Sequence, residues 1–357
     1  MKVPLLTIKE TPSPIEVKAD SLFVELTMRV ICCLLFGIPV DKNRSTSEGP
    51  PLEIEKVYQA MSVLSYRFLR VATGEKIWMK YLPTKSSREY WEARHYLEKF
   101  LTPRIDLALQ MRDKPNKDWS EISPLFKQSM LVKIAAKEPK YDRASLIAES
   151  IELSIGGTDS TAHSLSFALA ELSLNQNIFQ KARTIVDRSW ETYGGITLES
   201  LKDLSYIRAI FKETLRIYSV GSGSSSLQAE RDTTIADQPI PRGTKIFWST
   251  IAAGRDPSIY PNPEEFIPER WLGDDGKNNQ LLMIDFGSGS HRCLGEHLAI
   301  LEATVMLTML IRYFDWELVN GRSSLKNLQQ NLFIYPVDRM PAKFTVREFA
   351  KQTVNVK

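Results

Sequence analysis

The sequence has few cysteines, and they are not spaced as a disulfide framework. Only Cys32, Cys33 and Cys293 occur in 357 residues, and the first two are adjacent. Proteins that depend on disulfides carry several spaced cysteine pairs, so this usage indicates a reducing compartment, such as one that faces the cytosol.

Long apolar runs and blocks of like charge are also missing. The most apolar early segment, "LFVELTMRVICCLLFG", carries Glu25 and Arg29 and is too short to span a bilayer, so it indicates a core helix. The opening residues lack the apolar run of a signal peptide, and we expect no membrane anchor in the chain. The net charge is only +3, and no charge block is typical of a nucleic-acid or membrane-surface tail. We therefore expect no nucleic-acid partner.

The sequence has no internal repeat, and its lack of an alternating β-α pattern argues against a doubly wound nucleotide fold. Up to Tyr218 apolar residues recur at three- and four-residue spacing, and beyond it short β-prone pieces such as "TTIA" and "KIFWSTI" follow. The end, "LFIYPVDRMPAKFTVRE", is typical of a hairpin. We predict a mainly α protein with small β elements. Its helices are expected at 19–37, 53–72, 85–112, 121–136, 143–173, 176–192, 198–218 and 295–312.

One thiol stands out in what the sequence does contain. Cys293 lies in the glycine-rich stretch "FGSGSHRCLG", directly before a predicted helix. A thiolate is a strong, soft metal ligand when its charge is stabilised, here by loop N–H groups and by the positive end of a helix that begins at Gly295. Phe286 would supply apolar cover, and His291 and Arg292 would place cations near anionic groups of a ligand. These features fit a thiolate that ligates heme iron.

Two plainer interpretations of this loop compete with that one. Cys293 could be an ordinary buried cysteine at a helix start. A zinc site could combine His291, Cys293 and His297, but no fourth ligand lies nearby in the sequence.

The stretch resembles the heme-binding signature of the cytochrome P450 family, the heme-thiolate monooxygenases. His291 stands where the family usually has arginine, with Arg292 one position later. The positions of the signature that match are Phe286, Gly287, Gly289, Cys293 and Gly295.

A second pattern is "FKETLRIY", in which Glu213 and Arg216 would share one helix face. Such a pair is usually a solvated surface pair of small energetic value. Arg270 in "FIPERW" could extend it to three members. The resemblance implies that these residues match the family's Glu-Arg-Arg core network, which braces the heme loop and has a structural role.

A third pattern is "SIGGTDSTAHS", inside the long helical segment 143–173. Gly156 and Gly157 each cost about 1 kcal/mol relative to alanine in a helix interior, so the stretch predicts either a break between two helices or a kinked helix that admits a flat cofactor. The resemblance implies an acid–alcohol pair that delivers protons to bound oxygen. Its residues would be Asp159, Ser160 and Thr161.

The resemblance extends from about Ala19 to the C-terminus and includes the proline-rich segment "AGRDPSIYPNPEEFIPERWL". It implies a single cytochrome P450 domain over residues 1–357, truncated at the N-terminus, with a helix-rich region over residues 1–218 and a β and loop region over residues 219–357. Leu227 and Gln228 stand where relatives usually place a cation for a heme propionate. We therefore expect weakened heme retention.

The function that the resemblance implies is oxidation of an apolar organic substrate by O2 on heme b iron ligated by Cys293. Electrons would come from NAD(P)H through a cytochrome P450 reductase or a ferredoxin-type donor. The substrate would contact segments 153–155, 219–222 and 331–334. Two alternatives stay open: a heme-thiolate isomerase or dehydratase that does not use O2, and a heme-free, non-catalytic helical remnant.

Overall fold

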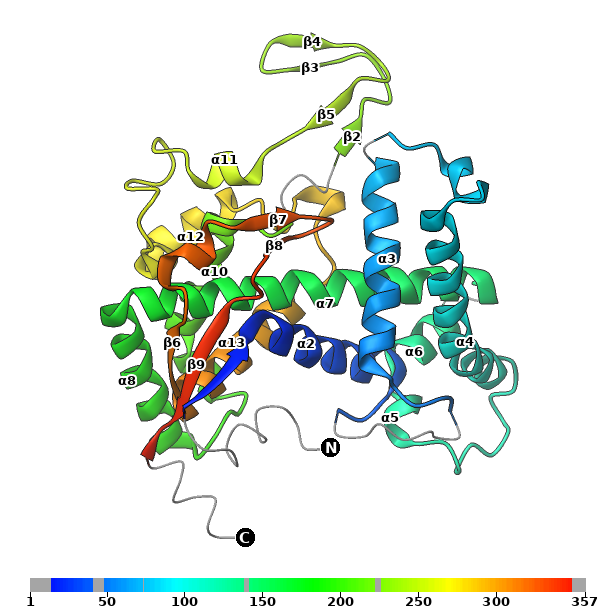
Figure 1. Cartoon of the computed structure of the whole chain (residues 1–357), viewed down its shortest axis with the longest axis horizontal. Helices are drawn as coiled ribbons and strands as arrows, with labels where there is room; N and C mark the ends of the chain where they lie inside the picture. Colours follow the sequence, from blue (N-terminus) through cyan, green and yellow to red (C-terminus); the bar gives the residue numbers. More distant parts are fainter. Residues whose placement is uncertain (1–13, 41–47, 73, 138–140, 222–225, 349–357) are drawn as a thin grey trace. The chain divides into compact units, whose positions relative to one another are not determined.

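The computed structural model describes residues 14–40, 48–72, 74–137, 141–221 and 226–348 (Figure 1). The chain forms two compact units. The first runs to Ala162 and takes in the chain end from Glu348, and the second is His163–Arg347. That residues 1–357 act as a single domain stays a prediction.

The first unit is built almost entirely of helices. Helix α3 packs on α4, and α4 on α6. Its elements are β1 (Ile15–Lys18), α2 (Ala19–Phe36), α3 (Ile54–Ala72), the 3-10 helix η1 (Ile77–Tyr81), α4 (Lys85–Asp113), α5 (Pro124–Lys127), α6 (Met130–Lys137) and the greater portion of α7 (Arg143–Leu174).

The apolar early segment forms the buried helix α2, as predicted. Phe23 and Met28 are fully buried on it. The helix ends at Gly37, which has a φ of 63° and donates its N–H to the Cys33 carbonyl at 2.9 Å. A side chain at Gly37 would lie 2.4 Å from Cα of Phe126, so both the turn and the close approach require glycine.

Helix α7 continues through Gly156 and Gly157, so the interpretation of these glycines as a helix break is wrong. Contacts with α2 support the helix at this point. The Thr27 hydroxyl donates to the Thr158 carbonyl at 3.1 Å, and Ile31 occupies the space beside Gly157. This packing offsets the weak helix propensity of the two glycines.

The second unit combines helices with antiparallel strand pairs, namely β2 with β5, β3 with β4, β6 with β9, and β7 with β8. Helix α13 packs on α10 and α8. Its elements, after the end of α7, are α8 (Gln176–Tyr193), α9 (Ser200–Asp203), α10 (Ser205–Tyr218), β2 (Ser226–Gln228), β3 (Thr233–Ile235), β4 (Gln238–Ile240), β5 (Lys245–Phe247), α11 (Thr250–Gly254), η2 (Pro268–Trp271), α12 (Gly273–Leu282), η3 (Gly289–His291), α13 (Glu296–Tyr313), β6 (Phe314–Leu318), η4 (Gly321–Leu325), β7 (Leu328–Gln330), β8 (Ile334–Pro336) and β9 (Pro341–Val346).

The main helices agree with the sequence predictions, but two predicted helices are divided. The segment 121–136 forms α5 and α6, because Ser123 caps α5 by accepting from the Phe126 N–H and Pro124 starts it. The segment 198–218 is interrupted at Leu204, whose ψ of 27° is outside the helical range.

Two further predictions on the β region need correction, and one helix was not predicted. The strand predicted in "KIFWSTI" forms but ends at Phe247, because Ser249 caps α11 through the Ala252 N–H. Residues 273–282 form the helix that was not predicted, α12. The terminal hairpin does not form, since β8 pairs with β7 and β9 with β6. A period of two predicts a strand but does not name its partner.

Among the residues described, no helix is both long enough and apolar enough to cross a membrane.

Candidate functional site

The cysteine loop is a closed turn in the second unit. The Cys293 N–H donates to the Phe286 carbonyl at 2.7 Å, which ties the two ends of the loop together. Gly287 and Gly289 have φ angles of 72° and 58°, and a Cβ on Gly287 would lie 3.0 Å from the His291 carbonyl oxygen. The loop conformation therefore depends on glycine at both positions.

The Cys293 side chain is exposed, and Leu294 beside it is 94 % exposed. Helix α13 begins directly after Gly295, so its unpaired N–H groups and positive dipole end lie close to the thiol in sequence. In the described residues, His291 and His297 do not join Cys293 in a cluster of metal-ligating side chains. An exposed thiol next to an exposed apolar side chain fits a residue that would bind the iron of a large apolar ligand such as heme.

The sequence predicts that Arg292 and His291 meet anionic groups of that ligand. The Arg292 guanidinium instead holds the Glu296 carboxylate, at 2.5 Å and 2.8 Å, across the first turn of α13. This pairing lowers the pKa of Glu296. His291 is exposed. A role of either residue toward a propionate stays a prediction.

The structure brings Glu213, Arg216 and Arg270 together. Glu213 is fully buried, and its carboxylate accepts hydrogen bonds from Nε and Nη2 of Arg216, at 2.9 Å and 2.8 Å. Arg270 Nε reaches Glu213 Oε1 at 3.3 Å. Two partners were not expected from the sequence: the Ile267 N–H and the Trp271 indole N–H each donate to the carboxylate at 2.9 Å. The only available signal was that both residues flank Arg270 within "FIPERW".

Arg216 also organises the proline-rich segment that follows α11. Its guanidinium donates to the carbonyls of Gly254, Pro263 and Glu265, at 2.6 Å, 2.7 Å and 3.0 Å. A Cβ on Gly254 would lie 2.3 Å from the Arg216 carbonyl oxygen, so this approach requires glycine. One buried cation thus holds a segment that has little regular structure of its own.

The acid–alcohol segment lies on α7 in the first unit. Thr161 is buried, while Asp159 and Ser160 are partly exposed. The Ser160 hydroxyl donates to the Gly156 carbonyl at 2.6 Å, one helical turn back. The cysteine loop belongs to the other unit, so the prediction that both serve one ligand stays a prediction.

Two of the three segments predicted to contact substrate meet in the second unit. The Ile334 N–H donates to the Val220 carbonyl at 3.0 Å. Ser222 lies outside the described residues, and segment 153–155 belongs to the first unit. Leu227 is 40 % exposed on β2, and the Gln228 amide donates to the Gly243 carbonyl at 3.3 Å.

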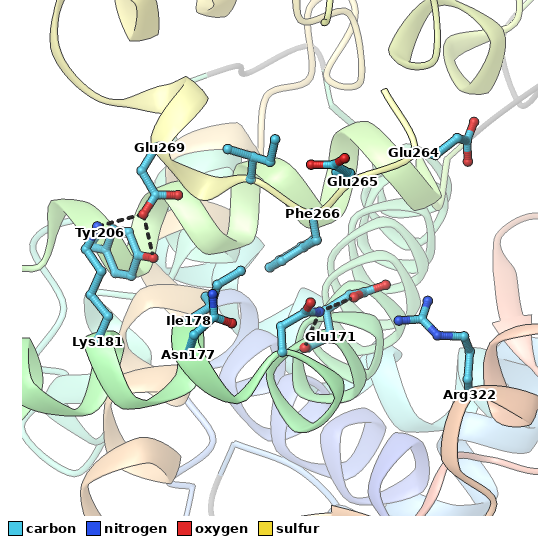
Figure 2. A pocket seen from close by; sticks show the side chains of 12 residues that line it. Glu171, Asn177, Ile178, Lys181, Tyr206, Glu264, Glu265, Phe266, Glu269 and Arg322 are labelled. Atoms are coloured by element: carbon cyan, nitrogen blue, oxygen red, sulfur yellow. Dashed lines mark hydrogen bonds and ion pairs between the residues drawn. The ribbon is translucent and has the colours of Figure 1, made fainter. Parts of the chain in front are cut away.

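A polar cleft of about 480 Å³ also lies in the second unit (Figure 2). On one side Glu269 accepts from the Lys181 ammonium at 2.6 Å and from the Tyr206 hydroxyl at 3.0 Å, and burial with this bond raises the pKa of Tyr206. None of the site residues predicted from the sequence lines it. The lining residues are Glu171, Asn175, Asn177, Ile178, Lys181, Tyr206, Glu264, Glu265, Phe266, Ile267, Glu269 and Arg322. Such a polar lining does not match the pocket expected for an apolar substrate.

Glu302 on α13 is a buried carboxyl group that no sequence pattern singles out. It is 7 % exposed, and in the described stretches of the chain its Oε1 has no hydrogen-bond partner. Burial raises the pKa of Glu302 to about 8 from an ordinary value of 4.5. The folded chain therefore holds an extra proton between these two pH values.

We predict that this proton makes stability fall as pH rises. The stability that this proton contributes is fully present below pH 4.5, declines between pH 4.5 and about 8, and is lost above about 8. The total loss is about 4–5 kcal/mol in the free energy of unfolding, at 1.36 kcal/mol per pKa unit. Glu302→Gln should remove this portion of the pH dependence of the urea midpoint. Glu317→Gln, which removes an exposed carboxyl on β6, should retain it. Parallel pH profiles for the parent and Glu302→Gln chains would contradict the prediction.

The two glycines of α7 offer a second prediction. A Cβ on Gly156 meets no atom within 4 Å, whereas a Cβ on Gly157 would lie 2.4 Å from Cδ1 of Ile31. Gly156→Ala should raise the free energy of unfolding by about 1 kcal/mol through helix propensity. Gly157→Ala should be about 1–3 kcal/mol less stable than Gly156→Ala, because Ile31 must move in a packed region. Urea unfolding of both variants measures the difference, and equal midpoints would show that Ile31 adjusts without cost.

Comparisons with known proteins show the family of the chain. The family model "Cytochrome P450" matches residues 7–344, and the chain belongs to this family. It is 33% identical over 225 residues to cytochrome P450 71A1 of Persea americana, covering 62% of this chain and 45% of that protein. It is 26% identical over 282 residues to the probable mitochondrial cytochrome P450 12c1 of Drosophila melanogaster, covering 75% and 52%. A third relative, cyclooctat-9-en-7-ol 5-monooxygenase of Streptomyces melanosporofaciens, is 25% identical over 290 residues, covering 80% and 58%. The chain spans about half the length of the curated relatives it matches.

Proposed function

We propose that this chain is a heme-dependent monooxygenase that oxidises an apolar organic substrate, in which Cys293 would bind the iron of heme b and residues 1–357 would act as one domain. The observation that carries the proposal is the exposed Cys293 thiol, held in a glycine loop ahead of α13. Relatives whose names include monooxygenase support the reaction class. Heme iron would supply oxygen activation there, with electrons that derive from NAD(P)H.

Two groups of residues in the second unit would hold the heme-binding loop in its conformation. The glycine loop and the N-terminus of α13 would hold the Cys293 sulfur in position to bind the iron. Phe286, Gly287, Gly289 and Gly295 shape the loop around it. Glu213, Arg216 and Arg270 hold the preceding segment in place and do not contact substrate.

Proton delivery would fall to α7. The Asp159 carboxyl would gate protons that reach the Ser160 hydroxyl, a role that Thr161 would share. In the structure the Ser160 hydroxyl donates to the Gly156 carbonyl, so delivery requires it to turn from that bond toward water.

The partners follow from the same chemistry. Electrons would come from a cytochrome P450 reductase or a ferredoxin-type donor in a compartment that keeps cysteines reduced, such as one that faces the cytosol. Mitochondrial relatives are among those matched.

A carbon-monoxide difference spectrum of the reduced, heme-supplemented protein tests the proposal. A red-shifted thiolate band, followed by oxidation of an apolar substrate that depends on both O2 and a reductase, would support it. Turnover of an organic peroxide without O2 would favour the isomerase or dehydratase. The absence of any heme absorption band would favour the non-catalytic remnant.

A further inference from the structure

The polar cleft of the second unit contains none of the residues assigned to heme binding or proton delivery (Figure 2). Its volume of about 480 Å³ lies within the range of small-molecule sites. Two buried apolar side chains, Ile178 and Phe266, line it together with charged and amide groups. The cleft can therefore accommodate a small molecule that has both an apolar body and polar groups.

Four carboxylates line the cleft, and three of them already have partners within the protein. The engaged sets are Glu171 with the Tyr218 hydroxyl and the Asn175 amide, Glu269 with Lys181 and the Tyr206 hydroxyl, and Glu264 with Arg255. Because protein groups occupy these three carboxylates, the cleft is not simply a site for cations.

Two charged side chains of the lining, Glu265 and Arg322, remain open to a ligand. Within the part of the chain that the structure describes, neither side chain forms a hydrogen bond or an ion pair. Both are exposed, so water solvates them in the free protein. Figure 2 shows the Arg322 guanidinium pointing toward Glu171, which also lines the cleft. The cleft thus offers a ligand one carboxylate and one guanidinium of opposite charge.

These two charges select the class of ligand. A simple anion would leave the Glu265 carboxylate uncompensated, and a simple cation would leave the Arg322 guanidinium uncompensated. A zwitterion satisfies both, because its ammonium can donate to the carboxylate and its carboxylate can accept two parallel N–H bonds from the guanidinium. The Asn177 amide also lines the cleft and is able to donate to and accept from a peptide group.

We propose that the cleft binds a small zwitterion of the amino-acid or short-peptide class. Its ammonium group contacts Glu265, its carboxylate contacts Arg322, and its apolar side chain packs against Phe266. Every residue of this site belongs to the second unit, and none of them takes part in the heme chemistry proposed above. The site therefore goes beyond the proposed function, and binding to it requires no heme.

Calorimetric titration of the full chain with L-phenylalanine and with glycyl-L-phenylalanine tests this proposal. We expect saturable binding of at least one of them, at one site per chain, and the tighter of the two distinguishes an amino acid from a short peptide. Phenethylamine lacks the carboxylate, and 3-phenylpropionate lacks the ammonium. Each should bind about tenfold more weakly than the tighter zwitterion, because one charge-assisted contact is lost.

Two variants assign the contacts. Arg322→Gln should weaken binding of the zwitterion about tenfold and leave binding of phenethylamine unchanged, since that probe has no carboxylate. Glu265→Gln should weaken binding of the zwitterion to a similar extent, but it should not weaken binding of 3-phenylpropionate, which has no ammonium.

The matched controls are Lys326→Gln and Glu317→Gln, which remove exposed charges of the second unit that do not line the cleft. Both should bind the zwitterion as the parent chain does. All four substituted side chains are exposed, so the variants should fold, and a urea midpoint verifies this. The proposal would be overturned by a lack of saturable binding to both zwitterions, by equal losses in the controls, or by a single-charge probe that binds as tightly as the zwitterion.

Discussion

Cys293→Ala should abolish the red-shifted carbonyl band of the reduced, heme-supplemented protein. Cys293 is the exposed thiol of a glycine loop directly before α13, where a large ligand can reach it. Burial raises the pKa of Cys32 to about 12, and that of Cys33 is raised for the same reason, so neither thiol is poised to ionise. The carbon-monoxide difference spectrum measures the outcome.

Cys33→Ala is the matched control for this substitution and should keep the band. Because the Cys293 side chain is exposed, its removal should change the free energy of unfolding of the heme-free chain by less than about 0.5 kcal/mol and leave the urea midpoint nearly the same. Loss of the band together with an unchanged midpoint would therefore identify a ligand and not a structural residue. A red-shifted band that survives in Cys293→Ala would show that the ligand assignment is wrong.

Glu213→Gln should lower the free energy of unfolding by about 3–5 kcal/mol, which is enough to remove most soluble protein. Glutamine has nearly the same shape, but it leaves the buried Arg216 guanidinium without its counter-charge. Its NH2 group also replaces one carboxylate oxygen, either Oε1, which accepts from Ile267 and Arg270, or Oε2, which accepts from Trp271, so a donor then faces a donor in either orientation. Denaturant unfolding, or the yield of soluble protein, measures the effect.

Glu264→Gln makes the same change of charge in a solvated pair. Glu264 is 74 % exposed and lies 3.4 Å from Arg255, so the cost should stay below about 1 kcal/mol. Similar losses in the two variants would mean that burial of Glu213 does not set its contribution. A Glu213→Gln protein that folds and holds heme but does not turn over would point to a chemical role.

The features that depend on local pattern could be predicted from the sequence. Helices such as α2 and α10 follow from apolar periodicity, and Glu213 and Arg216 share a helix face because they are three residues apart. Arg270 could be offered as a third member from "FIPERW", and the family resemblance supported it, although it lies far along the chain from Arg216. The network itself then requires the fold to place η2 beside α10.

The missed features depend on what surrounds a residue. Trp271 and the Ile267 N–H reach Glu213 only because a chain reversal brings them there. Glu302 lies in a helix predicted by periodicity, but the residue type alone does not show that its side chain is buried. Nor does it show that one carboxylate oxygen accepts no hydrogen bond from the described residues. Strand partners at the chain end were wrong because alternation defines a face but not a neighbour.

The hydrogen bonds from Arg216 to three backbone carbonyl groups affect local unfolding of the native state. The segment from Gly254 to Trp271 contains only short helical turns. Much of it is held in place by hydrogen bonds to two side chains of α10, the Arg216 guanidinium and the Glu213 carboxylate. It cannot then detach by the gradual fraying that is usual for loops, and it should open only when α10 itself opens. Its Ile267 amide should therefore exchange with deuterium as slowly as amides at the centre of α10, although it belongs to a proline-rich connection. Segment and helix would form one cooperative unit of the native state.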